Sequence, residues 1–177
     1  MKNEIFIHEL TLPFGRMRLG SLGDVLCLSS WLEGPKPDRP LSRLAAECHA
    51  DVKRGTTPVI VQAADELTAW CEGDRRVFDV PILMHGTEFQ QCVWQGLREL
   101  NYGEMTTYAA LSKRIGRARA VRAVAGACGA NPLHVLIPCH RVVGHGDLGG
   151  FAGGRELKMA LLRHEFEVTN TPILPAL

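Results

Sequence analysis

No apolar run in this 177-residue chain reaches the length of about 20 residues that a membrane-spanning helix needs. The formal net charge is only +1, so global charge does not indicate a nucleic-acid-binding protein, and any such surface must be local. The amino-terminal segment alternates between apolar and polar residues and lacks the long apolar core of a signal peptide. We therefore expect a cytoplasmic protein that does not contact a membrane.

The cysteines include no close-spaced C-x-x-C pair. Such pairs are typical of structural zinc sites, and scattered cysteines do not suit a disulfide framework either. The sequence therefore predicts free thiols and no metal site. The cysteines are Cys27, Cys48, Cys71, Cys92, Cys128 and Cys139.

Short alternating segments predict a small antiparallel sheet in the first part of the chain. A proline-rich stretch over residues 33–40 predicts an exposed loop. Apolar residues at helical spacing then predict two helices, the second closed by Gly73. The expected strands cover residues 4–10, 16–19 and 25–28, and the expected helices cover residues 41–53 and 61–70.

The composition changes after a linker at residues 74–86. Thr87 and Gln90 have the spacing of a helix-capping box, and apolar residues follow at helical spacing. We therefore predict a boundary near residue 82, with one domain over residues 1–82 and a mostly helical domain over residues 83–177. The overall fold class is α+β.

A basic segment follows in the second domain. Residues 106–115 place Tyr108 on an apolar helix face, Gly116 suits a left-handed helix end, and residues 118–128 are rich in small residues. Two helices joined by a glycine turn and edged with arginines match a helix-turn-helix. A solvated basic helix pair is an equally good interpretation of this segment alone. Its basic residues are Lys113, Arg114, Arg117, Arg119 and Arg122, with no acid among them.

The segment 131–143 carries the clearest chemical signal. Apolar residues lead to a proline and then to Cys139, His140 and Arg141. A neighbouring base or cation raises the thiolate fraction of a cysteine, and His140 and Arg141 are candidates for both roles. Adjacent residues on an extended chain point to opposite faces, so a contact between Cys139 and His140 requires a turn or a bridging water. The alternative is a buried structural cysteine.

The segment from Asn131-Pro132 to Ile137-Pro138-Cys139-His140-Arg141-Val142-Val143 resembles the active-site signature of the O6-alkylguanine-DNA alkyltransferases. The resemblance covers about residues 86–166, and its further motifs include the segment that begins at Gly103 and the one that ends at Glu165. It implies the metal-free bacterial type, with a small ribonuclease-H-like α/β domain before a winged-helix-like domain that contains the helix-turn-helix.

The resemblance also implies catalytic roles. Cys139 would accept the alkyl group, His140 would act as a base through a water molecule, and Glu165 would orient His140. Tyr108 would donate a hydrogen bond to the guanine that leaves, and Asn131 would tie the helix-turn-helix to the active-site segment. The thioether formed on Cys139 is stable, so each molecule would act once, and no cofactor is needed.

Residues of the helix-turn-helix are the implied DNA contacts. Arg122 would enter the duplex and occupy the place of the flipped nucleotide, because the target oxygen is inaccessible inside the stack. Ala123 and Ala127 would let the helix backbone approach the groove, and Arg119 and Thr107 are further candidate contacts.

The implied substrate pocket contains Val142, Cys128, Phe151 and Ala152. The backbone carbonyl of Val142 would bind the guanine amine. Phe151 stands where many family members have tyrosine, and Ala152 stands where some have serine. Phe166 replaces the glycine that usually follows the glutamate. These departures concern the substrate range and the rate.

The expected partner is double-stranded DNA that carries O6-alkylguanine, and the expected state is a monomer. The main alternative is a non-catalytic protein of the same fold that only binds alkylated DNA, although such proteins carry another residue at the acceptor position. A self-methylating transcription regulator would need clustered metal-binding cysteines. A cysteine hydrolase using Cys139 and His140 would show multiple turnovers.

Overall fold

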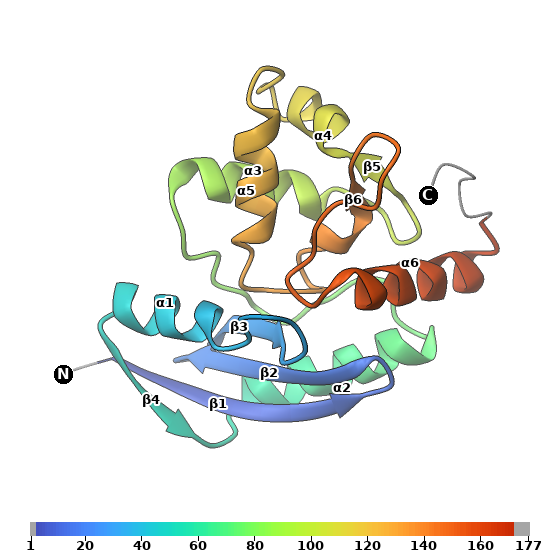
Figure 1. The fold of residues 1–177 in the computed structure, drawn as a ribbon. Coiled ribbons are helices and arrows are strands. Elements are labelled where there is room, and N and C mark those ends of the chain that lie inside the picture. Colours follow the sequence, from blue (N-terminus) through green and yellow to red (C-terminus); the bar gives the residue numbers. More distant parts are fainter. Residues whose placement is uncertain (1–2, 172–177) are drawn as a thin grey trace.

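The structure is a computed structural model that describes residues 3–171. A four-stranded sheet with helices α1 and α2 forms the lower part of the molecule in Figure 1, and helices α3, α4 and α5 form the upper part. Helix α6 runs beside the junction of the two parts. No helix within residues 3–171 is long and apolar enough to cross a membrane.

The sheet has the strand order β3-β2-β1-β4. The first three strands form an antiparallel meander, as the alternating segments predict, and β4 pairs with β1 in parallel. The strands are longer than expected because the meander continues through tight turns. Their bounds are Asn3–Leu12 for β1, Gly15–Leu22 for β2, Val25–Trp31 for β3 and Ala50–Arg54 for β4.

The helix predicted over residues 41–53 is wrong in its second half. Helix α1 spans Arg39–Glu47, so it begins inside the expected loop with Pro40 in its first turn, where proline is tolerated. His49 then adopts a positive φ of 49°, and Ala50–Arg54 form strand β4. The edge of β1 offers unpaired backbone groups to this segment, and pairing with them outweighs its helical spacing.

Helix α2, Pro58–Glu72, packs its apolar face on the sheet. The Thr57 side chain accepts a hydrogen bond from the backbone N–H of Ile60, and Pro58 occupies the first turn. Gly73 ends the helix with a φ of +82°, so the expected glycine end is confirmed. The buried apolar residues of α2 are Val59, Ile60, Ala63, Leu67 and Trp70.

The second half of the chain is mostly helical, and the α+β fold class is confirmed. Thr87 and Gln90 form the predicted capping box at the start of α3, and Gly116 has the predicted positive φ, at 71°. The elements are α3 (Glu88–Arg98), β5 (Thr106–Thr107), α4 (Tyr108–Arg114), α5 (Val121–Gly129), a 3-10 turn η1 (Cys139–Arg141), β6 (Val142–Val143) and α6 (Arg155–Thr169).

The edge of β3 joins the two halves through backbone hydrogen bonds. Leu26 pairs with the linker, donating to the carbonyl of Pro81 at 2.8 Å. Ser29 pairs with the segment before the cysteine: its N–H donates to Pro132, and its carbonyl accepts from His134 at 2.6 Å. One apolar cluster also contains residues of both halves. The division at residue 82 stays a prediction, and residues 172–177 of the second predicted domain lie outside the described residues.

Candidate active site

Cys139 and His140 lie on the single 3-10 turn η1, and both are buried. Cys139 is 7% exposed and His140 is 0% exposed. On an extended chain, neighbouring side chains point to opposite faces, but the backbone turns at these two residues. The two side chains can therefore serve one site.

Asn131 fixes the turn that leads to Cys139. Its side-chain amide donates to the carbonyl of Ile137 at 2.8 Å and to Sγ of Cys139 at 3.2 Å. Its side-chain oxygen accepts from the N–H of Leu133 at 2.9 Å. All three contacts are buried, so they constrain the position of the sulfur strongly.

The backbone between Asn131 and Cys139 is strained at Val135, whose φ is +74°. A β-branched residue rarely adopts this conformation, which costs about 1–3 kcal/mol. The flanking contacts of Asn131 and the pairing of Ser29 with His134 hold the segment in place. The N-terminal sheet therefore helps to hold the active-site segment.

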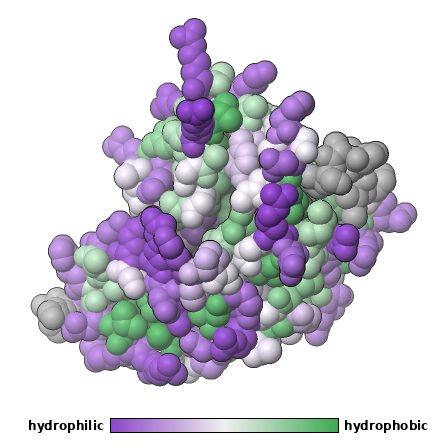
Figure 2. Space-filling model, in the orientation of Figure 1, coloured by the Kyte–Doolittle hydropathy of each residue, from purple (hydrophilic) through white to green (hydrophobic). Residues whose placement is uncertain are grey.

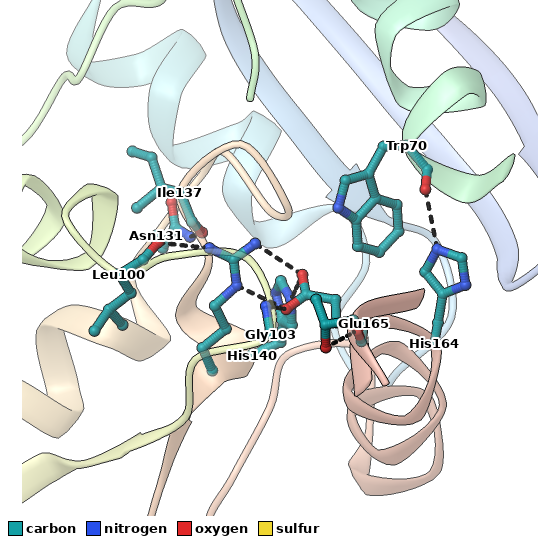
Figure 3. A network of polar contacts seen from close by, with 10 residues as sticks. Trp70, Leu100, Gly103, Asn131, Ile137, His140, His164 and Glu165 are labelled. Carbon is teal, nitrogen blue, oxygen red and sulfur yellow. Dashed lines mark hydrogen bonds and ion pairs between the residues drawn. The ribbon is translucent and has the colours of Figure 1, made fainter. Parts of the chain in front are cut away.

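Glu165, on α6, is fully buried and lies beside His140 (Figure 3); it binds both His140 and Arg141. Its Oε1 lies 2.8 Å from Nε2 of His140 and accepts from the Arg141 guanidinium at 2.8 Å. Its Oε2 accepts from Nε of Arg141 at 2.8 Å and from the N–H of Gly103 at 3.1 Å. The carboxylate is thus saturated with donors.

These contacts set the charges of the cluster. Burial by itself would raise the pKa of Glu165, but His140 and Arg141 outweigh burial and lower this pKa to about 2. Burial lowers the pKa of His140, and the attraction of Glu165 only partly offsets this effect. The pair therefore consists of an ionised Glu165 and a neutral His140. Nε2 of His140 then donates to Glu165, and Nδ1 has no hydrogen-bond partner among the described residues.

The cation that acts on Cys139 is Lys158, which is not among the site residues expected from the sequence. Burial raises the pKa of Cys139, while the Asn131 hydrogen bond and Lys158 lower it in part. Nζ of Lys158 donates to the carbonyls of Val142, Leu148 and Gly150, at 2.6, 2.7 and 3.0 Å. Burial lowers the pKa of Lys158 to about 8, so the amine is still mostly charged at neutral pH.

Arg141 was the other expected cation, but its guanidinium binds Glu165 and the carbonyl of Leu100 instead. The sequence does contain a signal for Lys158. Lys158 and Glu165 lie two helical turns apart, in line with the buried Leu161 and Leu162. Lysine and glutamate are almost never fully buried unless they are paired, so their presence on the buried face of a helix indicates a specific role.

A cavity of about 440 Å³ borders Cys139. Tyr108, Cys128, Phe151 and Ala152 line it, so the structure brings together four of the predicted site residues. Val142 is not part of this wall, because it is fully buried and its carbonyl accepts from Lys158. Burial raises the pKa of Tyr108 to about 12, so its hydroxyl keeps its proton.

The loop before α1 forms another part of the cavity wall. Lys36 and Arg39 line the cavity together with Pro35 and Pro40. From the sequence, this stretch is expected only to form an exposed loop. Its two basic residues are the only sequence signal that could have assigned it to the site. Phe166, on α6, does not line the cavity and lies in a buried apolar cluster with Val143, Leu148 and Leu162.

Helices α4 and α5 form the predicted helix-turn-helix. Arg119, Arg122 and Ala123 are exposed, whereas Ala127 is 4% exposed and its carbonyl accepts from Nε1 of Trp94. The Thr107 side chain accepts from the N–H of Ala110 and caps α4. Figure 2, in the orientation of Figure 1, shows hydrophilic side chains that project from the turn between α4 and α5.

Among the basic residues of this turn, Arg114 bonds with Glu104 at 3.1 Å. No ion pair within residues 3–171 involves Lys113, Arg117, Arg119 or Arg122. All six cysteines are free thiols. In the described part of the chain, no group of three or more His, Cys, Asp or Glu side chains could hold a metal ion.

Comparisons with known proteins show which family and which solved structures this chain is similar to. Residues 88–167 match the family model described as 6-O-methylguanine DNA methyltransferase, DNA binding domain. A methylated-DNA–protein-cysteine methyltransferase of Haemophilus influenzae is 44% identical over 115 residues, which are 64% of this chain and 64% of the relative. The alignment thus spans less than two thirds of that relative's length.

Two solved structures extend the match to nearly the whole chain. The Mycobacterium tuberculosis O6-methylguanine methyltransferase is 35% identical, with a TM-score of 0.78, over 92% of this chain and 93% of that chain. The M. tuberculosis protein in complex with DNA is 34% identical, with a TM-score of 0.77, over 93% of this chain and 94% of that chain.

The fold and the site define an α+β protein in which a buried cysteine lies beside a helix-turn-helix. The chain belongs to the O6-methylguanine methyltransferase family.

Proposed function

We propose that this protein repairs DNA by direct reversal: it flips O6-alkylguanine out of the duplex and transfers the alkyl group irreversibly to Cys139. The observation that carries the proposal is the position of Cys139, which lines the cavity, while His140 lies next to it on the same buried turn and is paired with Glu165 of α6. Membership of the family and the M. tuberculosis relative in complex with DNA support it.

The buried thiol requires a base. Because burial raises the pKa of Cys139, the resting sulfur carries its proton. Nδ1 of neutral His140 is the nitrogen that can accept this proton through a bridging water, and Glu165 stabilises the imidazolium that forms. No cofactor takes part.

In the transfer itself, the sulfur of Cys139 attacks the alkyl carbon, a C–S bond forms and the bond from that carbon to O6 breaks. The guanine leaves as an anion, which the protonated hydroxyl of Tyr108 stabilises from the cavity wall. The proton from the thiol finally returns to the guanine. None of these reaction steps cleaves the thioether, so each protein molecule reacts once.

The helix-turn-helix supplies the contacts to DNA in this proposal. Arg122 enters the duplex and offsets the cost of extruding the base, and Arg119 contacts phosphate. The exposed Ala123 lets α5 approach the groove. The buried Ala127 instead packs the helix against α3 through the Trp94 contact. The protein acts as a cytoplasmic monomer on duplex DNA.

The measurement that tests the proposal is the intact mass of the protein after incubation with excess duplex containing O6-methylguanine. We expect one added methyl group per chain, mapped to Cys139, and no addition with undamaged duplex. Cys139→Ala should bind the damaged duplex and gain no methyl group. Unchanged mass with retained binding would favour the non-catalytic lesion-binding protein, and multiple turnovers on an ester would favour the hydrolase.

A further inference from the structure

Trp70 comes from the N-terminal half of the molecule and contacts His140, the imidazole of the His140–Glu165 pair. It lies near the end of α2 and is fully buried. Its ring centroid lies 6.2 Å from that of His140, with the two planes at 75°, an edge-to-face arrangement. Figure 3 shows the indole beside this pair, on the side away from Asn131.

The same indole contacts two other segments that surround the pair. Its ring lies 6.3 Å from that of Tyr102 and 5.1 Å from that of His164, both at steep angles. The backbone carbonyl of Trp70 lies 3.0 Å from Nε2 of His164, the residue directly before Glu165. Trp70 is therefore fixed against η1, α6 and the loop after α3 at once.

We infer that Trp70 is a positioning residue for the reaction: it fixes the plane of the His140 imidazole and keeps water away from the His140–Glu165 pair. The inference rests on the proposed function, in which His140 accepts the thiol proton. An edge-to-face contact restricts rotation of the imidazole, because rotation would lose the favourable ring geometry. Exclusion of water strengthens the hydrogen bond between His140 and Glu165.

The groups that act electrostatically on His140 come from several elements. Glu165 and Lys158 come from α6, Arg141 from η1, and His134 from the segment before the cysteine. Helix α2 adds only the uncharged indole at this point. Replacing Trp70 therefore leaves every one of these charges in place and changes only packing and the access of water.

The test compares Trp70→Leu and Trp70→Phe with Ile60→Ala. Ile60 is buried on the same helix, about 15 Å away at 1.5 Å per residue, and it controls for general weakening of α2. The rate of methyl transfer from the O6-methylguanine duplex is measured from about pH 5 to 9, the range in which a histidine base titrates. Thermal stability and binding to the duplex are measured in parallel, and NMR follows the titration of the His140 ring.

We expect Trp70→Leu to slow transfer by about tenfold or more, because a misoriented base loses part of its contribution. Admission of water should raise the pKa of His140, so the acid limb of the rate profile and the NMR titration should both move to higher pH. Trp70→Phe keeps a ring edge and should restore most of the rate. Ile60→Ala should lower stability with no change in either pH profile.

A normal His140 titration in Trp70→Leu, with a rate loss no larger than in Ile60→Ala, would overturn the positioning role. Failure of the proposed function would look different: wild-type protein would transfer no methyl group, while the NMR titration of His140 would still report the effect of Trp70. If Trp70→Leu shifts the His140 titration but the wild type transfers no methyl group, the Trp70–His140 contact is supported and its role in the reaction is ruled out.

Discussion

Asn131 donates its side-chain amide to the sulfur of Cys139 at 3.2 Å and thereby joins the end of α5 to the proposed acceptor. The backbone N–H of Asn131 also donates to the carbonyl of Cys128, the last buried residue of that helix. A shift of α5 would therefore be transmitted to the sulfur. This connection offers a route by which binding at the helix-turn-helix can affect the acceptor.

Asn131→Ala should lower the reactivity of Cys139. The amide hydrogen bond lowers the pKa of this thiol, so its loss should raise the pKa further and slow alkylation by iodoacetamide at neutral pH. The variant also leaves the N–H of Leu133 without its partner, which should cost about 1–3 kcal/mol of stability. Alkylation rates against pH, followed by mass spectrometry, test the first effect. An unchanged pH profile would remove Asn131 from the control of the thiol.

Glu165→Gln should change the pH dependence of folding. The pKa of Glu165 is lowered from 4.5 to about 2, so its carboxylate stabilises the fold fully above pH 4.5, and this contribution is lost as pH falls toward 2. The wild type should therefore lose about 3 kcal/mol more than the variant across this window. Urea denaturation at successive pH values measures the difference. Parallel curves for the two proteins would contradict the low pKa.

Lys158→Met should lower both the stability of the protein and the reactivity of the Cys139 thiol. The buried carbonyls of Val142 and Leu148 and the carbonyl of Gly150 lose their shared donor, which should lower the free energy of unfolding by about 1–3 kcal/mol. Loss of the nearby cation should also raise the pKa of Cys139 and slow methyl transfer. Lys53→Met, on the exposed strand β4, is the control for charge removal. Equal rates in the two variants would show that Lys158 is purely structural.

Arg122→Ala should weaken repair of duplex DNA far more than reaction with free O6-benzylguanine. Only the duplex requires extrusion of the base, so the loss should be about tenfold or more on the duplex and small on the free base. Arg54→Ala, an exposed arginine on β4, removes the same charge away from the helix-turn-helix. Equal losses on both substrates would argue against a base-flipping role for Arg122.

Features that depend on neighbouring residues were predictable from the sequence. The capping box of Thr87 and Gln90, and the glycine ends at Gly73 and Gly116, are confirmed because a few adjacent backbone groups determine them. Segment 131–143 made Cys139 and His140 candidates from local sequence, and the family resemblance then implied their roles. The roles proposed for these residues remain predictions.

The strand β4 was not predictable in this way. Its sequence continues the apolar spacing of α1, and only the free edge of β1, far away in the chain, favours an extended conformation. The loop of Lys36 and Arg39 was likewise placed on the cavity wall by contacts with the second half of the molecule. Long-range pairing outweighs local propensity in both cases.

The sequence by itself determined the three-stranded meander, the capping box at Thr87, the glycine helix ends and the cysteine motif, because each depends on hydrogen bonds and spacing within a few residues. Only the tertiary structure decided the charges of the site. Burial keeps Cys139 protonated and His140 neutral, and Arg141 turns to Glu165 while Lys158 approaches the thiol. The physical reason is that desolvation and charge pairing depend on which distant segments exclude water from a group, and no local pattern encodes that.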